Sequence, residues 1–164
     1  MLAARRIKMK LRPVTDADSA AVVELIDSCL REIGDRVFPE GEGQDLMNPE
    51  ASYAGRGGAF VFMEDDTGIT GTHAVLPTSE NGTATFRRLY VRKDMRGHGV
   101  GKRLMQWAID EAIAKGFERV VFWSDTRFAH AHEFFRRFGF VKGETRDMDD
   151  GAVPYSEFRF ERAL

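Results

Sequence analysis

The pattern of apolar and polar positions predicts a chain of short strands and amphipathic helices. The stretches IKMKLRPV, AFVFMED and ITGTHAVL are typical of strands, and the turn residues 65–68 suit a hairpin between the last two. The stretch TDADSAAVVELIDSCLREIG predicts a helix that begins at a capping box of Thr15 and Asp18. From Gly34 to Gly58 periodicity is lost apart from a helical turn near residues 44–53. This segment therefore predicts a long, partly irregular connection.

A third strand, predicted over Thr83 to Arg92, changes phase in its middle. Its first apolar positions alternate as a buried face should, whereas Leu89 and Val91 are one residue out of phase. A β-bulge near Arg87 to Leu89 restores the alternation and leaves backbone N–H and C=O groups available to a ligand. The competing interpretation places Arg88 at a strand edge facing water, and the sequence leaves both open.

The stretch VRKDMRGHGVGKRLM, residues 91–105, sets three glycines at the start of an apolar stripe of helical spacing that ends at Gly116. The first turn of a helix leaves N–H groups unpaired and attracts anions, and glycine allows close approach. From Arg87 to Arg103, seven Lys or Arg residues accompany one Asp, a local net charge of +6. The pattern predicts a phosphate-binding loop, and the alternative is a solvated basic face. Neither the Walker pattern nor the dinucleotide fingerprint fits, because arginine or lysine replaces required residues.

Composition narrows the classes of protein. With 164 residues and 43% hydrophobic content, the chain predicts one domain spanning residues 1–164. A formal net charge of −2 gives no global attraction to nucleic acid, and no run of eighteen apolar residues predicts a membrane span. MLAARRIKMK lacks the apolar centre of a secretory signal, and Cys29, the only cysteine, lies among apolar residues at helical spacing. We expect a cytoplasmic protein in which Cys29 packs in the core.

The run LYVRKDMRGHGVGKRLM resembles the acyl-CoA-binding core of the GNAT superfamily of N-acetyltransferases. The family signature is Arg or Gln, two residues, Gly, one residue, then Gly or Ala, and Arg96, Gly99 and Gly101 fill it. The order of the predicted elements is similar to this family over nearly the whole chain. The resemblance implies an α/β (α+β) fold: a mixed, mostly antiparallel sheet of six to seven strands flanked by about four helices. In that fold a splayed parallel strand pair forms the acyl-CoA cleft.

The downstream segments fit the same order of elements. VVFWS, residues 120–124, predicts a strand buried on both faces, and the resemblance makes it the parallel partner of the bulged strand. TRFAHAHEFFRRFGF predicts a helix with one apolar face, ended by Gly139. The last segment predicts two strands joined at an Asp150-Gly151 turn.

The resemblance also implies acetyl-CoA as co-substrate, with no metal. Backbone groups of Leu89, Tyr90 and Val91 would hold the pantetheine arm, and a backbone N–H of Tyr90 or Val91 would stabilise the oxyanion. The loop residues implied for the pyrophosphate are Arg96, Gly97, His98, Gly99, Val100, Gly101 and Lys102. We count Phe135 with the cofactor-binding residues.

Proton transfer is where the sequence departs from the family. Phe135 stands where many members have a tyrosine as the thiolate acid, and Thr85 stands where a glutamate often serves as the base. A thiol with a pKa of about 8.5 can leave with little help, so these changes need not end catalysis. The candidate substitutes are His132 and Ser124 as the acid, and His73, His130 and Glu32 as the base.

The sequence thus predicts transfer of an acetyl group from acetyl-CoA to a primary amine of a small molecule or a protein, by direct attack. The missing tyrosine and glutamate keep an alternative open, a catalytically weak or inactive acyl-CoA-binding or sensor protein. Residues 34–58 hold five acids and two arginines, so a cationic acceptor is one hypothesis and an ordinary solvated loop the other. A homodimer is expected only from the habit of the family.

Overall fold

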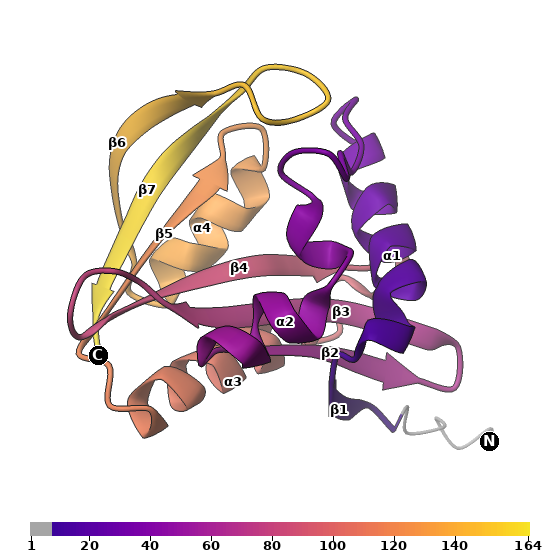
Figure 1. The fold of residues 1–164 in the computed structure, drawn as a ribbon, viewed down its shortest axis with the longest axis horizontal. Coiled ribbons are helices and arrows are strands. Elements are labelled where there is room, and N and C mark those ends of the chain that lie inside the picture. Colours follow the sequence, from indigo (N-terminus) through magenta and orange to yellow (C-terminus); the bar gives the residue numbers. More distant parts are fainter. Residues whose placement is uncertain (1–7) are drawn as a thin grey trace.

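A computed structural model describes residues 8–164, which form one seven-stranded sheet with helices on both faces (Figure 1). The strands lie in the order β1-β2-β3-β4-β5-β7-β6. The expectations for residues 1–7, including the absence of a secretory signal, lie outside the described residues. The strands are β1 (Lys10–Pro13), β2 (Ala59–Asp65), β3 (Gly68–Pro77), β4 (Thr83–Val91), β5 (Arg119–Asp125), β6 (Val141–Met148) and β7 (Tyr155–Ala163). The α-helices are α1 (Ser19–Arg31), α2 (Pro49–Ser52), α3 (Val100–Ala114) and α4 (Ala129–Arg137).

The sheet is antiparallel except where β4 meets β5. These two strands run parallel and pair only at Thr83 with Arg119 and at Ala84 with Val120. Beyond this point they diverge, and Figure 1 shows β5 rising away from β4. The predicted mixed sheet with a splayed parallel pair is therefore confirmed.

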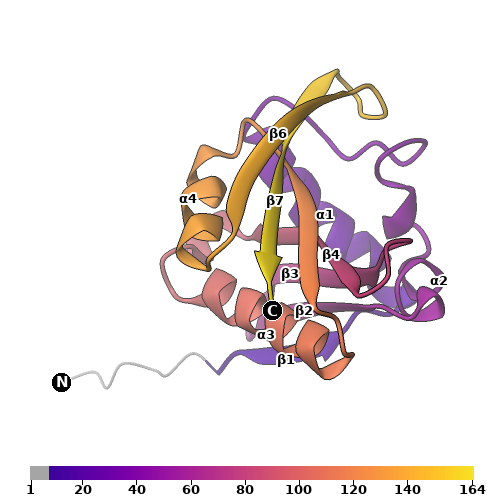
Figure 2. The same ribbon diagram turned by 90° about the vertical axis from the view of Figure 1, so that its left-hand side faces the viewer.

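Alternation along the central strands directs side chains into two cores, one on each face of the sheet. Phe62 of β2 packs with Ile26 of α1, whereas Met63, the next residue, packs with Leu104 of α3. Figure 2 shows α1 and α2 on one side of the sheet and α3 and α4 on the other. Cys29 is 2% exposed within the α1 core, as predicted.

Local signals set the helix ends. The Asp18 carboxylate accepts a hydrogen bond from the backbone N–H of Thr15 at 2.8 Å, which confirms the capping box. Gly116 and Gly139, with φ of +82° and +85°, follow α3 and α4 as predicted. Within the irregular connection, short helical turns occupy residues 44–46, 49–52 and 54–56.

The prediction that β5 is buried on both faces is wrong. Val120 and Phe122 are buried, but Val121, Trp123 and Ser124 are only partly buried. The divergence from β4 contributes, because beyond Val120 the edge of β5 toward β4 borders the cleft, which Trp123 and Ser124 line, while the other edge stays paired with β7. An apolar run of five residues does not distinguish a face packed on a helix from a face lining a cleft.

Candidate active site

The register between β3 and β4 shifts at the predicted β-bulge. Thr72 pairs with Tyr90 and Ala74 pairs with Arg87, so two residues of β4 lie opposite one residue of β3. Arg88 has φ of +61°, the only positive φ among non-glycine residues in the described part of the chain. The bulge is confirmed, and its backbone departs from the ladder where β4 separates from β5.

Side chains of β3 fix the carbonyl groups of the bulge. The Thr72 hydroxyl donates to the Arg88 carbonyl at 2.7 Å, and His73 Nδ1 lies 3.1 Å from the Arg87 carbonyl. These carbonyls are therefore held toward β3. Sequence reasoning did not identify Thr72, and nothing in the local pattern distinguishes it from an ordinary strand threonine.

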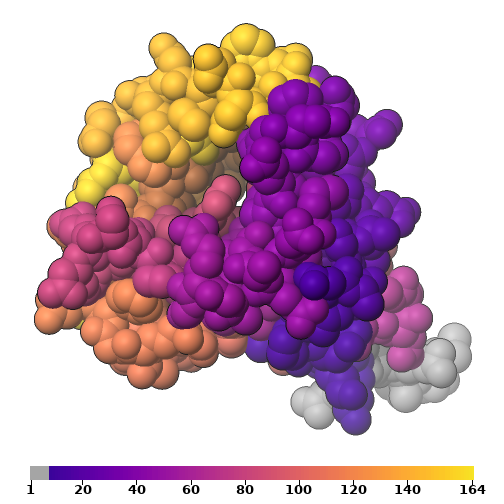
Figure 3. All heavy atoms as spheres, viewed as in Figure 1, coloured from indigo at the N-terminus to yellow at the C-terminus, as the bar shows by residue number. Residues whose placement is uncertain are grey.

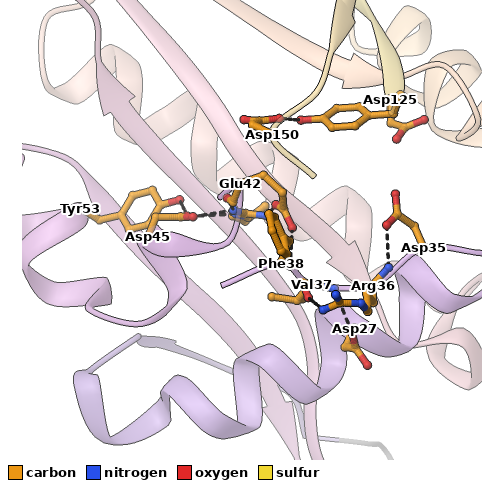
Figure 4. Close-up of polar contacts among 12 residues, drawn as sticks. Asp27, Asp35, Arg36, Val37, Phe38, Glu42, Asp45, Tyr53, Asp125 and Asp150 are labelled. Atoms are coloured by element: carbon orange, nitrogen blue, oxygen red, sulfur yellow. Dashed lines mark hydrogen bonds and ion pairs between the residues drawn. The ribbon is translucent and has the colours of Figure 1, made fainter. Parts of the chain in front are cut away.

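Arg88 is buried, so its interpretation as an edge residue facing water is wrong. It is 9% exposed, and its guanidinium donates to both carboxylate oxygens of Asp45 at 3.0 and 2.5 Å and to Glu42 at 3.0 Å. Figure 4 shows both acids on the connection after α1, with Tyr53 beside Asp45. Burial alone would raise the pKa of Asp45, but the charge and hydrogen bonds of Arg88 outweigh it and hold that pKa below its ordinary value.

A cleft of about 340 Å³ opens where β4 and β5 diverge. Figure 3 shows a hollow between β4, the connection after α1 and the β6–β7 hairpin. The floor of the cleft includes Thr85, Leu89 and Tyr90 of β4, and its wall includes Trp123 and Ser124 of β5. A volume near 300 Å³ is at the lower end of small-molecule sites.

Two loops meet above this cleft. The backbone N–H of Glu42 donates to the carbonyl of Asp150 in the β6–β7 turn at 2.9 Å. A β-carbon at Gly41 would lie 2.0 Å from the same carbonyl oxygen, so only glycine permits this approach. The contact encloses the cleft between segments more than 100 residues apart in the sequence.

Most carboxylates around the cleft already have an arginine partner. Arg127 bonds Asp35 at 2.7 Å and Asp125 at 2.6 Å, and so joins the end of α1 to the end of β5. Arg146 bonds Glu157 at 2.7 Å and lies over the ring of Trp123. Sequence reasoning missed these pairs. Only Arg127 and Asp35 are far apart in the sequence, by 92 residues, whereas Asp125 is two residues from Arg127 and Glu157 lies opposite Arg146 in the β6–β7 hairpin.

The glycine loop leads directly into α3. Gly97 and Gly99 have φ of +80° and +82°, and Gly99 is the N-cap. Within residues 8–164 no side chain caps this helix, so the N–H groups of its first turn are left for another acceptor. A β-carbon at Gly101 would lie 3.8 Å from the Phe134 ring, which shows how closely α3 approaches α4. The exposed side chain of Lys102 adds positive charge here.

Arg96 of the signature points away from the first turn of α3. Its guanidinium donates to both carboxylate oxygens of Glu32 at 2.8 and 2.6 Å and to the Val91 carbonyl at 3.1 Å. The Arg96 hydrogen bonds lower the pKa of Glu32, the residue considered as a base. Arg96 thus ties the loop to the end of α1, and its role in phosphate binding stays a prediction.

The structure places one acid candidate, Ser124, in the wall of the cleft and the other, His132, behind that wall. His132 Nε2 lies 3.0 Å from the Asp125 carbonyl and 3.5 Å from Ser124 Oγ, and burial lowers the pKa of His132. Ser124 lines the cleft and His132 does not, so the pair could act only through the hydroxyl. Phe135 is buried at the cleft and packs on Phe122. His130 is exposed on α4.

His73 is 1% exposed, and burial lowers its pKa to about 4. The folded protein therefore binds no proton here until pH approaches 4, whereas an unfolded histidine is protonated below about 6.5. Folding stability accordingly falls as pH drops through this window. We expect the loss of unfolding free energy from pH 7 to pH 5 to be about 2 kcal/mol smaller in His73→Asn than in the wild type.

Urea unfolding at the two pH values measures this difference. His130→Asn is the matched control, because His130 is exposed, and it should keep the wild-type pH dependence. Equal losses in His73→Asn and the wild type would contradict the buried, neutral state of His73.

The comparisons agree with this geometry. Residues 22–140, more than half of the chain, match the GNAT acetyltransferase family. The chain is 28% identical over 159 residues to an aminoalkylphosphonate N-acetyltransferase from Salmonella typhimurium, covering 94% of this chain and 91% of the relative. It is 28% identical over 125 residues to an IAA acetyltransferase from Azospirillum brasilense, covering 74% and 77%.

Two solved structures show the same fold at lower identity. A GNAT-family acetyltransferase from Staphylococcus aureus superposes with a TM-score of 0.83 at 19% identity, covering 96% of this chain and 99% of that one. A protein from Salmonella typhimurium, solved with its cofactor acetyl-CoA, has a TM-score of 0.72 at 20% identity, covering 95% and 94%.

The splayed strands, the bulge and the family match together define the class: this chain belongs to the GNAT acetyltransferase family. It is an acyltransferase that uses acetyl-CoA, as the names of its relatives and the family indicate. Among the described residues, no three His, Cys, Asp or Glu side chains gather where they could hold a metal ion. No helix within residues 8–164 has the length and apolarity needed to cross a membrane.

Proposed function

We propose that this enzyme transfers the acetyl group of acetyl-CoA to the primary amine of a small molecule that enters the cleft between β4 and β5. The observation that carries the proposal is the bulged end of β4, which borders the cleft and leads into the uncapped first turn of α3. The thioester would lie at the bulge and the diphosphate at Gly97 to Lys102, where first-turn N–H groups and the helix dipole favour an anion.

In the reaction, the neutral amine nitrogen attacks the thioester carbonyl carbon. The carbon–sulfur bond breaks and an amide forms; the nitrogen loses one proton and the coenzyme A thiolate takes one, so no net proton is consumed. A backbone N–H of Tyr90 or Val91 would stabilise the oxyanion. The thiolate can leave without the acid absent at Phe135, because a thiol is a good leaving group at a pKa of about 8.5. Water in the cleft next to Ser124 is the proposed proton carrier.

A small acceptor suits the enclosure of the cleft better than a protein does. The contact between Glu42 and Asp150 encloses the opening, and the volume of about 340 Å³ matches a molecule of modest size. The relative from Salmonella typhimurium is named for aminoalkylphosphonates, which are small amines, and this name supports the same choice for the present chain.

The test is a thiol-release assay with acetyl-CoA and a panel of small amines, amino acids, polyamines and amine-terminated peptides. We expect release with small amines at a kcat/KM at least about tenfold above that with peptides. Thr85 lines the cleft where family members often have glutamate, and this substitution favours the second candidate, a protein that binds acyl-CoA without turnover. Calorimetric binding of acetyl-CoA without thiol release across the panel would establish that candidate and refute the enzyme.

A further inference from the structure

Charges on the cleft surface are unevenly matched. Glu42, Asp35, Asp125 and Glu157 line the cleft, and each is bonded to an arginine. Asp150 is the remaining lining carboxylate and accepts a hydrogen bond from the Tyr155 hydroxyl at 2.6 Å. Arg88 pairs with both Glu42 and Asp45, and Arg127 with both Asp35 and Asp125, so these pairs keep a net negative charge although each lining carboxylate of the connection after α1 has an arginine partner.

Two lining arginines have no carboxylate partner for their guanidinium group within residues 8–164. The guanidinium of Arg36, at the rim after α1, donates to the neighbouring Val37 carbonyl and lies over the ring of Phe38, while the backbone N–H of Arg36 donates to Asp35 at 2.8 Å (Figure 4). Arg87 is exposed on β4, and none of the ion pairs of the described chain involves it. Its neighbour Arg88 makes the ion pairs with Glu42 and Asp45, whereas Arg87 acts on Asp45 only through its charge, so the N–H donors of Arg87 remain available to a ligand.

Arg87 lies on β4 beside the bulge and shares the cleft with Thr85. Thr85 and Arg87 are two positions apart on one strand and both line the cleft, which puts their Cα atoms about 7 Å apart. Arg87 immediately precedes the bulge, where we propose that the thioester lies. An anionic group two or three bonds from the amine would reach this guanidinium while the nitrogen faces the thioester.

We propose that the acceptor is an amine that also carries an anionic group, and that Arg87 binds this group. A phosphonate, phosphate or carboxylate all provide oxygen atoms for the planar guanidinium, which can bond such groups with two N–H donors. This inference rests on the proposed function and deepens it by naming the substrate class. The proposal takes the place of the hypothesis of a purely cationic acceptor. In it, the anionic group of the acceptor binds Arg87 on β4.

The test compares 2-aminoethylphosphonate with propylamine, which has a similar length and no anionic group. In the wild type kcat/KM should favour the phosphonate, and Arg87→Met should lower the ratio of the two kcat/KM values by roughly 10- to 100-fold, the effect of one hydrogen bond to a charged group. Arg87→Lys should retain part of the ratio. Arg56→Met is the control, because Arg56 is an exposed arginine away from the cleft, and it should keep the wild-type ratio. Substituting β-alanine or phosphoethanolamine for the phosphonate then shows which anionic group is preferred.

Calorimetry separates this inference from the proposed function. With coenzyme A present, 2-aminoethylphosphonate should bind the wild type and lose about 10-fold or more in affinity to Arg87→Met. If that loss of affinity occurs but no amine is acetylated, the result supports Arg87 as the anion-binding residue and contradicts the proposed acetyl transfer. Preference for propylamine or spermidine, an unchanged ratio in Arg87→Met, or no binding of the phosphonate would each overturn the anionic acceptor.

Discussion

Replacing Gly99 by glutamate is expected to raise the dissociation constant for coenzyme A by at least about 100-fold while the chain still folds. A β-carbon at Gly99 meets nothing within 4 Å, so the new carboxylate would extend into the space proposed for the diphosphate. Like charges brought together in a binding site cost several kcal/mol. The φ of +82° adds strain of about 1–2 kcal/mol, which lowers stability without preventing folding. Calorimetric titration with coenzyme A measures the affinity.

Gly116→Glu provides a matched control for this variant. Gly116 also has φ of +82° and open space around its β-carbon, but it follows the opposite end of α3. Both variants should lose similar thermal stability, and only Gly99→Glu should lose coenzyme A. Wild-type affinity in Gly99→Glu would exclude the diphosphate from this loop.

Replacing Arg88 by methionine is expected to lower the free energy of unfolding by about 3–5 kcal/mol. The substitution leaves the carboxylates of Glu42 and Asp45 largely buried, 17% and 11% exposed, with no positive partner. Arginine and methionine are both unbranched at Cβ, so the φ of +61° should strain both side chains alike and add little to the loss. Urea unfolding at pH 7 measures the loss.

Two further variants separate the ion pairs from general disruption at this position. Adding Glu42→Gln and Asp45→Asn to Arg88→Met removes the uncompensated charges, so part of the lost stability should return. Arg136→Met removes an exposed arginine that pairs with Glu133 on the helix surface and should change stability little. A loss in Arg88→Met as small as that in Arg136→Met would show that the buried pairs contribute nothing.

Most of the fold of this chain could be predicted from local sequence patterns. The phase change in β4 revealed the bulge, because a two-residue period shifts visibly when one residue is inserted. The glycines after α3 and α4 marked helix ends, because each adopts a positive φ. The strand β5 was misjudged for the opposite reason: its exposed face depends on where β4 turns away, which no local pattern records.

The site was harder to predict because several of its ion pairs join residues that are far apart in the sequence. Arg88 bonds acids 43 and 46 residues earlier, in a segment without periodicity. Arg127 bonds Asp35, 92 residues earlier. A count of acids in residues 34–58 therefore suggested a cationic acceptor, although most of those carboxylates are taken by arginines. The adjacent arginines Arg87 and Arg88 were the one sequence signal of this charge arrangement. Only the structure shows that Arg88 is buried in ion pairs while Arg87 is exposed.

The ion pairs of Arg88 join two parts of the enzyme whose sequences could otherwise change independently. One end of this side chain belongs to the β4 backbone that would present the thioester, and the other is held by the segment after α1 that borders the acceptor. Grafting a foreign segment between α1 and β2 to change substrate choice would therefore also disturb the backbone at the acyl group, unless the graft brings both acids with it. In this lineage acceptor choice and acyl-transfer geometry should be inherited as one unit.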